Sequence, residues 1–247
     1  MSPDESPSIY SLPLFPLHTV LFPQFTLQLH IFEARYKAMI SSCIERNAPF
    51  GVVLIREGQE TGPVAVPHDV GCMARILDFK QLEDGRLHLL AVGERRFRLL
   101  EYRETELAYL VGQVETLEDI PPVPEAASPM VAKMTTLFQT YLRLLSETAS
   151  LQLPEIELPE DPSVLAFCIA SILQMSLADK QRLLAMTDSQ ERLFEEIRFL
   201  RHQIEDLVAI RARRASSAEE SEPQVVIAEP IDLRTEGWRR FEQESRN

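Results

Sequence analysis

Glycine is the residue whose distribution most constrains the fold of this chain. Seven of the eight glycines lie before residue 113, and the last is Gly237, so that residues 113–236 contain none. Tight turns between strands often need the positive φ angles that glycine adopts freely, whereas glycine destabilises the interior of a helix. The pattern therefore predicts an α+β protein with a β-rich part over residues 1–120 and a helical part over residues 121–210.

Apolar periodicity divides the first part into strands around one helix. Alternating or continuous apolar runs predict strands at 9–22, 25–29, 50–55, 70–79, 87–92, 96–102 and 109–117. The first run contains Pro13 and Pro16, which cannot donate to a ladder, so we expect it at a sheet edge or as a kinked segment. Asp84-Gly85 predicts a hairpin, and three- and four-residue steps predict a helix over 33–47. Several short strands of this kind indicate a small barrel or sandwich.

The second part begins after a proline-rich linker at residues 120–124. Ser128-Pro129, Asp161-Pro162 and Ser176 are typical helix starts, and a last helix is expected from Asp188 or Ser189. Its apolar seam is expected to pack on a helix of the same domain, with a partner helix as the alternative. Residues 211–247 are predicted to be a disordered tail, with a short docking peptide as the alternative.

Charge and cysteine content exclude several classes of protein. The chain has 247 residues, and its 25 basic and 38 acidic side chains give a net charge of −13. This acidic balance argues against a protein whose main function is to bind the phosphate backbone of nucleic acids. No apolar run is long enough to cross a bilayer, and the first residues lack the features of a signal peptide, so a cytoplasmic protein is expected. Cys43, Cys72 and Cys168 are far apart and odd in number, which favours reduced core cysteines.

Motifs that carry chemistry are missing from the sequence. It contains no phosphate-binding loop, no dinucleotide fingerprint, no H-E-x-x-H and no G-x-S-x-G. The five histidines are scattered, and none pairs with a cysteine at metal-ligand spacing. We therefore expect no enzyme, no cofactor and no metal site, and the residues alone favour a binding module.

One dense basic stretch comprises Arg95, Arg96 and Arg98. Its functional interpretation is a contact to an anion or a nucleic acid. Its structural interpretation is the outward face of a strand whose other face carries Phe97 and Leu99. The acidic balance of the surrounding segment favours the second interpretation.

Longer runs of the sequence resemble a known family. Residues 12–23 (LPLFPLHTVLFP) and 27–40 (LQLHIFEARYKAMI) resemble the opening of the N-terminal domain of Lon-type ATP-dependent proteases. Further runs fit the same family in order and spacing, at 50–55 (FGVVLI), 70–76 (VGCMARI), 92–101 (VGERRFRLLE) and 161–193. The resemblance covers about residues 10–207. It implies a PUA-like β-rich pseudobarrel with one helix, followed by a C-terminal helical bundle.

The resemblance also implies a function. In full-length Lon this domain binds unfolded or damaged polypeptides, whereas this sequence shows neither an AAA+ module nor a Ser–Lys peptidase domain. We therefore expect a stand-alone, non-enzymatic polypeptide-binding protein that acts in protein quality control. Its expected partners are unfolded polypeptides and, as an adaptor, a protease or chaperone, with no membrane. The alternative is a PUA-like domain that binds nucleic acid, a possibility that rests on fold analogy and the three arginines.

The candidate binding residues are aromatic. Phe15, Phe22 and Phe25 lie in proline-kinked segments, where proline would hold aromatic rings out of a regular ladder and expose them to a peptide. The alternative is that these rings fill the barrel. Phe32 and Tyr36 are expected in the core on the apolar face of the helix.

Overall fold

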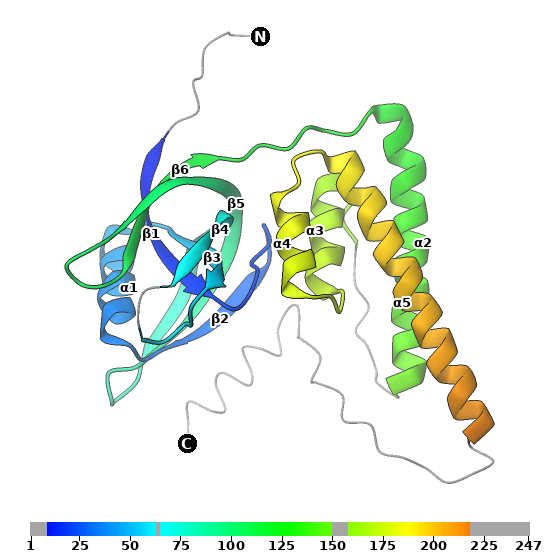
Figure 1. Ribbon diagram of the computed structural model, residues 1–247, viewed down its shortest axis with the longest axis horizontal. Coiled ribbons are helices and arrows are strands. Elements are labelled where there is room, and N and C mark those ends of the chain that lie inside the picture. The colour runs from blue at the N-terminus through cyan, green and yellow to red at the C-terminus, as the bar shows by residue number, and fades with distance from the viewer. Residues whose placement is uncertain (1–8, 63–64, 150–157, 218–247) are drawn as a thin grey trace. The chain divides into compact units, whose positions relative to one another are not determined.

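The computed structural model describes residues 9–62, 65–149 and 158–217, which form six strands and five helices and confirm the α+β class (Figure 1). The chain divides into two compact units, the first comprising residues up to 132 together with 158–196. The second unit comprises residues 133–157 and those from 197 onward. The first unit thus contains two helices of the second half of the chain in addition to the strands.

The strands of the first unit form one mixed sheet that closes into a barrel (Figure 1). They are β1 (Tyr10–Leu17), β2 (Thr26–Ile31), β3 (Phe50–Glu57), β4 (Val66–Gln81), β5 (Leu87–Glu104) and β6 (Leu110–Thr116). Their order is β2-β5-β4-β3-β1-β6, and a further pairing of β5 with β6 closes the ring. Among the strands of the described residues only β1 and β3 run parallel to each other, and the other paired strands are antiparallel.

Strand β1 lies inside the sheet, so the expectation of an edge strand was wrong. Its first half pairs with β6 up to Leu14, and its second half pairs with β3 from Leu14 onward. Pro13 therefore has a strand on the β6 side only, and Pro16 on the β3 side only. Proline is tolerated in a strand where the position of its missing N–H faces a side without a ladder, and each of these prolines has such a side.

Strand β5 runs without a break where two strands were predicted. Two β-bulges, at Glu94 and Leu100, each add one unpaired residue and bend the strand around the barrel. The predicted hairpin between β4 and β5 is confirmed, and the Gly85 N–H donates to the Leu82 carbonyl over 2.9 Å. Gly85 alone in this turn has a positive φ, of 76°, so the turn is not the two-residue type that Asp-Gly favours.

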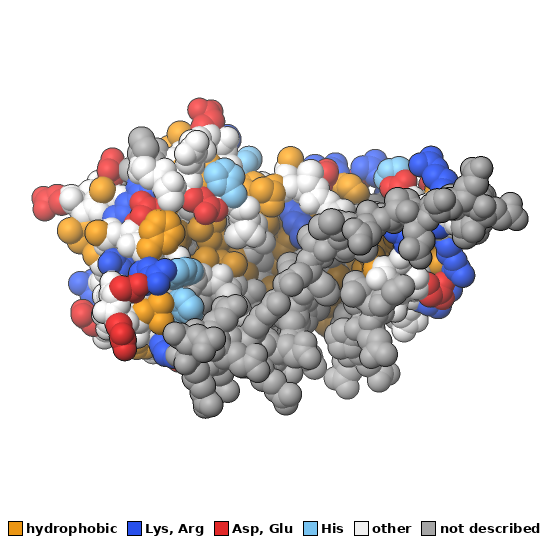
Figure 2. All heavy atoms as spheres, turned by 90° about the horizontal axis from the view of Figure 1, so that it is seen from below, with side chains coloured by type: hydrophobic (Ala, Val, Ile, Leu, Met, Phe, Trp, Pro, Cys, Tyr) orange, Lys and Arg blue, Asp and Glu red, His pale blue; other side chains and the backbone are white. Residues whose placement is uncertain are grey.

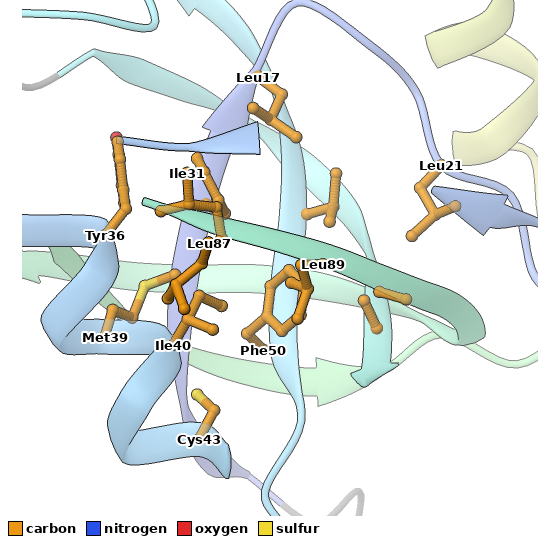
Figure 3. Packing of buried hydrophobic residues seen from close by; sticks show 14 of the residues in the cluster. Leu17, Leu21, Ile31, Tyr36, Met39, Ile40, Cys43, Phe50, Leu87 and Leu89 are labelled. Atoms are coloured by element: carbon orange, nitrogen blue, oxygen red, sulfur yellow. The ribbon is translucent and has the colours of Figure 1, made fainter. Parts of the chain in front are cut away.

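Helix α1 (Ala34–Arg46) covers the barrel and completes its core. Glu33 occupies the N-cap, and Asn47 ends the helix in the left-handed region with φ 48°, which confirms the predicted helix within a residue at each end. Met39 and Ile40 point toward Phe50 and Leu87 across the core (Figure 3). The Glu33–Arg35 ion pair, 3.0 Å long, lies at the start of this helix, and Arg35 also donates to the Glu60 carbonyl.

Four helices follow the strands, namely α2 (Pro124–Ala149), α3 (Pro162–Ile172), α4 (Leu177–Ala185) and α5 (Ser189–Ser217). Asp161 and Ser176 cap α3 and α4 through their side chains, as predicted. The predicted start of α2 was wrong, because that helix begins at Pro124 and contains Pro129. Residues 211–217, predicted as disordered, belong to α5, and the rest of the predicted tail, 218–247, lies outside the described residues.

The second unit holds α2 and α5 together at their ends. Arg211 forms an ion pair with Glu147, and the Arg214 guanidinium donates to the Thr148 carbonyl. Ile197 and Leu200, in the apolar seam of α5, are buried. The packing of the α5 seam on a helix of the same domain stays a prediction.

Candidate functional site

Two of the three predicted peptide-binding aromatics fill the core. Phe15 is 6% exposed and stacks on Tyr36 with ring centroids 4.2 Å apart. Phe22 is 1% exposed, and its ring lies 5.9 Å from that of Phe167 in α3. In this conformation neither ring offers a surface to a peptide, which is the alternative interpretation given above. Phe25 is half-buried and packs against two apolar clusters, so it alone of the three keeps an accessible face.

Phe32 was expected in the core and is instead 54% exposed. It follows β2 directly and precedes α1, so the strand alternation still governs it, and Ile31 points inward while Phe32 points outward. Its ring lies 6.3 Å from that of His30, which in turn lies 4.8 Å from the His88 ring on β5. Figure 2 shows hydrophobic side chains exposed beside histidines on the strand-rich part of the molecule.

Arg96 does not present its charge to an anion in solvent, so its predicted contact is corrected. The side chain is buried, and its Nη1 donates to the carbonyls of Leu184 and Met186 over 2.6 Å each. Its Nη2 donates to Asp119, and the same carboxylate accepts from Arg192. Burial lowers the pKa of Arg96 to about 10, against the opposing effect of Asp119. Arg96 therefore joins the barrel to α4 and the start of α5 within the first unit.

Arg95 and Arg98 remain at the surface. Arg98 lies 3.5 Å from Glu115 on the neighbouring strand, an ion pair that partly neutralises it. The predicted anion contact therefore reduces to these two residues. Local sequence does not distinguish these two residues from Arg96, because the carbonyls that accept from Arg96 lie 88 and 90 residues further along the chain.

The cysteines are placed as buried thiols. Cys43, Cys72 and Cys168 are free and buried. Burial raises the pKa of Cys43 to about 11, and burial also raises the pKa of Cys72. Both thiols are therefore protonated near neutral pH and are poor nucleophiles. Within the described ranges, His, Cys, Asp and Glu side chains form no group of three placed to hold a metal ion, and no helix has the length and apolar character to span a bilayer.

One side of β2 has no strand paired with it among the described residues. In the part of the chain that the structure describes, β5 is the only strand paired with β2. We call the side of β2 that faces away from β5 the β2 edge. Gly93 helps to set this strand in place, because a Cβ there would lie 2.3 Å from the Phe22 carbonyl oxygen, and its N–H donates to the Phe25 carbonyl.

Side chains divide cleanly between the two faces of β2. Thr26, Gln28 and His30 are exposed on the outer face. Phe25, Leu27 and Leu29 are half-buried and pack against the core on the inner face. The sequence predicted this alternation but not the open edge, because pairing partners depend on topology rather than on local pattern.

Comparisons with known proteins agree with this architecture. The family model described as the ATP-dependent protease La (LON) substrate-binding domain matches residues 11–202. A crystal structure titled Lon N-terminal domain protein from Xanthomonas campestris is 32% identical, with a TM-score of 0.58 over 76% of this chain and 96% of that one. The N-terminal domain of the Mycobacterium avium complex Lon protease shares the fold, with 20% identity, a TM-score of 0.56, and coverage of 77% and 98%.

Curated relatives are much longer than this chain. The Lon protease of Syntrophus aciditrophicus is 31% identical over 205 residues, which are 79% of this chain and 25% of that protein. The Lon protease of Escherichia coli strain K12 is 26% identical over 216 residues, 86% of this chain and 27% of that protein. The chain thus spans about a quarter of the length of these relatives. From the family match and the shared fold, it belongs to the Lon substrate-binding domain family.

Proposed function

We propose that this protein binds polypeptides and performs no bond-making or bond-breaking itself. The observation that carries the proposal is the apolar surface around β2 in a chain of the Lon substrate-binding domain family. Phe25, Leu27 and Leu29 are half-buried on the inner face of β2, and Phe32 exposes more than half of its surface at the end of the strand. Apolar surface of this kind contacts unfolded chains without requiring a particular sequence.

The binding proposed here is selective for unfolded polypeptides. A folded protein has buried its apolar side chains and paired its strand edges, so it offers little to this surface. An unfolded chain exposes both. The protein would thereby act in quality control, either by holding such chains or as an adaptor that presents them to a protease or a chaperone.

A cytoplasmic setting is part of the same proposal. The three cysteines are free and buried, as in proteins of a reducing compartment. Nucleic-acid binding is the weaker alternative, since Arg96 is buried and hydrogen-bonded within the protein and Arg98 is paired with Glu115.

The test compares two states of one polypeptide. Reduced and carboxamidomethylated α-lactalbumin, which stays unfolded, and native α-lactalbumin are labelled and titrated with the protein at 150 mM salt, with anisotropy as the readout. We expect saturable binding of the unfolded form at micromolar concentrations and at least tenfold weaker binding of the native form. Equal binding of both forms, or of neither, would refute the proposal.

A further inference from the structure

We propose that the bound polypeptide adds to the barrel as a further strand along the β2 edge. This inference rests on the proposed function and specifies how the polypeptide is held. It predicts which backbone groups of the protein bind and which groups of the ligand they meet.

The phase of the β2–β5 ladder identifies the backbone groups that face outward. The Gly93 N–H donates to the Phe25 carbonyl over 2.8 Å, and the Gly93 carbonyl accepts from the Gln24 N–H over 2.7 Å. Gly93 thus forms a hydrogen-bonded pair with the two residues of a bulge, and the register then places Thr26 opposite Val92. In an antiparallel ladder such pairs alternate with pairs that exchange no hydrogen bonds. Thr26, Gln28 and His30 therefore turn their N–H and C=O groups away from β5.

These outward groups have no partner in the rest of the described chain. No hydrogen bond joins the outward backbone groups of Thr26, Gln28 or His30 to another residue within 9–62, 65–149 or 158–217. All three residues are exposed. They form a row of alternating donors and acceptors of the kind that a β-strand partner completes.

Strand β2 lacks the features that commonly prevent an edge strand from pairing with another chain. Strand β2 has the sequence TLQLHI, which contains no proline, no lysine and no carboxylate. Edge strands of monomeric proteins are commonly guarded by charged side chains, proline or bulges that prevent pairing. The register of β2 against β5 shows no bulge from Thr26 to Ile31, and the bulge at Gln24 and Phe25 lies before the strand. The six residues of β2 thus lack these protecting features.

The side chains define the chemistry of the ligand. A strand added beside β2 places alternate side chains next to Phe25, Leu27 and Leu29 on the inner face and the others next to Gln28 and His30 on the outer face. The ligand is therefore an extended segment of about six residues with apolar side chains at alternate positions, matching the six residues of β2. Such segments are exposed in unfolded chains and paired in folded ones.

The test uses a substitution at the centre of the edge. Gln28→Pro removes the outward N–H of that residue and leaves its neighbours' hydrogen bonds to β5 intact, since Gln28 belongs to a pair that exchanges none with Leu90. Gln28→Thr is the matched control, because it keeps the N–H and a strand-forming side chain. The probe is a labelled ten-residue peptide with leucine at alternate positions and serine between them. We expect at least tenfold weaker binding for Gln28→Pro and less than twofold change for Gln28→Thr.

Backbone methylation of the probe gives a second test that does not depend on the stability of any variant. If the peptide runs antiparallel to β2, its serine N–H groups face β2 and its leucine N–H groups face away, and a parallel peptide reverses the two sets. Methylation of one set should therefore weaken binding to the wild-type protein at least tenfold, while methylation of the other set leaves it within twofold. An equal effect of both sets would overturn strand addition.

The outcomes separate this inference from the proposed function. If the wild-type protein binds unfolded α-lactalbumin while neither Gln28→Pro nor methylation weakens peptide binding, strand addition is overturned and polypeptide binding stands. If the wild-type protein binds no unfolded polypeptide, the proposed function itself fails. If Gln28→Pro dissociates a dimer of this chain and leaves peptide binding unchanged, the edge serves self-association and the inference is overturned.

Discussion

Arg192 donates two parallel hydrogen bonds to Asp119, from Nη1 to Oδ1 over 3.0 Å and from Nη2 to Oδ2 over 2.9 Å. The Arg192 side chain is fully buried, and its guanidinium lies 4.0 Å from the centre of the Phe167 ring. Arg96 binds the same carboxylate from the barrel side. One acidic residue thus compensates two buried arginines, and it connects β5 with the start of α5 in the first unit.

Loss of this carboxylate should destabilise the protein. Asp119→Ala leaves Arg96 and Arg192 buried without a counter-charge, and removing one member of a buried ion network costs about 3 kcal/mol. Chemical denaturation followed by circular dichroism measures the free energy of unfolding.

A carboxylate in an exposed ion pair provides the matched control. Asp69, whose side chain is 78% exposed, lies 3.7 Å from Arg56, and Asp69→Ala should change the free energy of unfolding by less than about 1 kcal/mol. Equal effects of the two substitutions would show that the Asp119 network stabilises the fold no more than an exposed ion pair does.

Glu196 should make stability fall as the pH rises. Its carboxylate is buried with no hydrogen-bond partner among the described residues, and burial raises its pKa well above the usual range, opposed by the charge of Arg192. A carboxyl group with a raised folded-state pKa binds its proton more tightly in the folded state, so stability is lost above the unfolded-state pKa.

The measurement compares Glu196→Gln with the wild-type protein between pH 4 and pH 8. The neutral amide removes the penalty, so the variant should be the more stable protein at pH 8, with the difference shrinking toward pH 4. A difference that stays constant over this range, or grows toward pH 4, would contradict the assignment of a raised pKa to Glu196.

The three thiols should not react with a disulfide reagent while the protein is folded. Burial raises the pKa of Cys43 to about 11 and raises that of Cys72, and Cys168 is also buried. A disulfide reagent that reports thiolate release should show no rapid reaction at pH 8 in buffer and three reacting thiols in 6 M guanidinium chloride. A thiol that reacts within seconds in the native protein would show that one of these sites opens readily.

Phe32 should contribute to binding and little to stability. Its side chain is 54% exposed, so Phe32→Ser should change the free energy of unfolding by less than about 0.5 kcal/mol. If the apolar surface around β2 holds polypeptides, the same substitution should weaken binding of unfolded α-lactalbumin by about tenfold, which corresponds to 1.4 kcal/mol. Anisotropy titration measures this change.

A second exposed apolar residue controls for nonspecific adhesion. Val208 on α5 is 50% exposed and lies in the second unit. Val208→Ser should leave the affinity within twofold. Equal losses for the two variants would mean that unfolded chains adhere to any apolar surface of this protein.

Local patterns predicted the elements whose signals are local. Helix α1, the caps at Asp161 and Ser176, and the start of α5 at Ser189 follow from periodicity and capping chemistry, and all are confirmed. Strand β5 was divided in two because a bulge such as that at Glu94 interrupts the alternation without ending the strand.

The site was harder to predict because it depends on contacts between distant segments. Arg96 is indistinguishable from Arg95 in sequence, and its buried partners, the carbonyls of Leu184 and Met186 and the carboxylate of Asp119, lie elsewhere along the chain. Phe22 is covered by Phe167, far along the chain. Phe32 could have been found by extending the alternation of β2 one residue further, since the helix begins only at Ala34.

Amide hydrogen exchange measured by NMR tests the central claim most directly. In the free protein the amides of Thr26, Gln28 and His30 should exchange quickly, while those of Leu27 and Leu29, bonded to β5, exchange slowly. With saturating unfolded α-lactalbumin, we predict that the three outward amides become protected. Saturable binding that leaves all three amides exchanging as fast as in the free protein, or no binding at all, would contradict the view that this protein holds unfolded chains along β2.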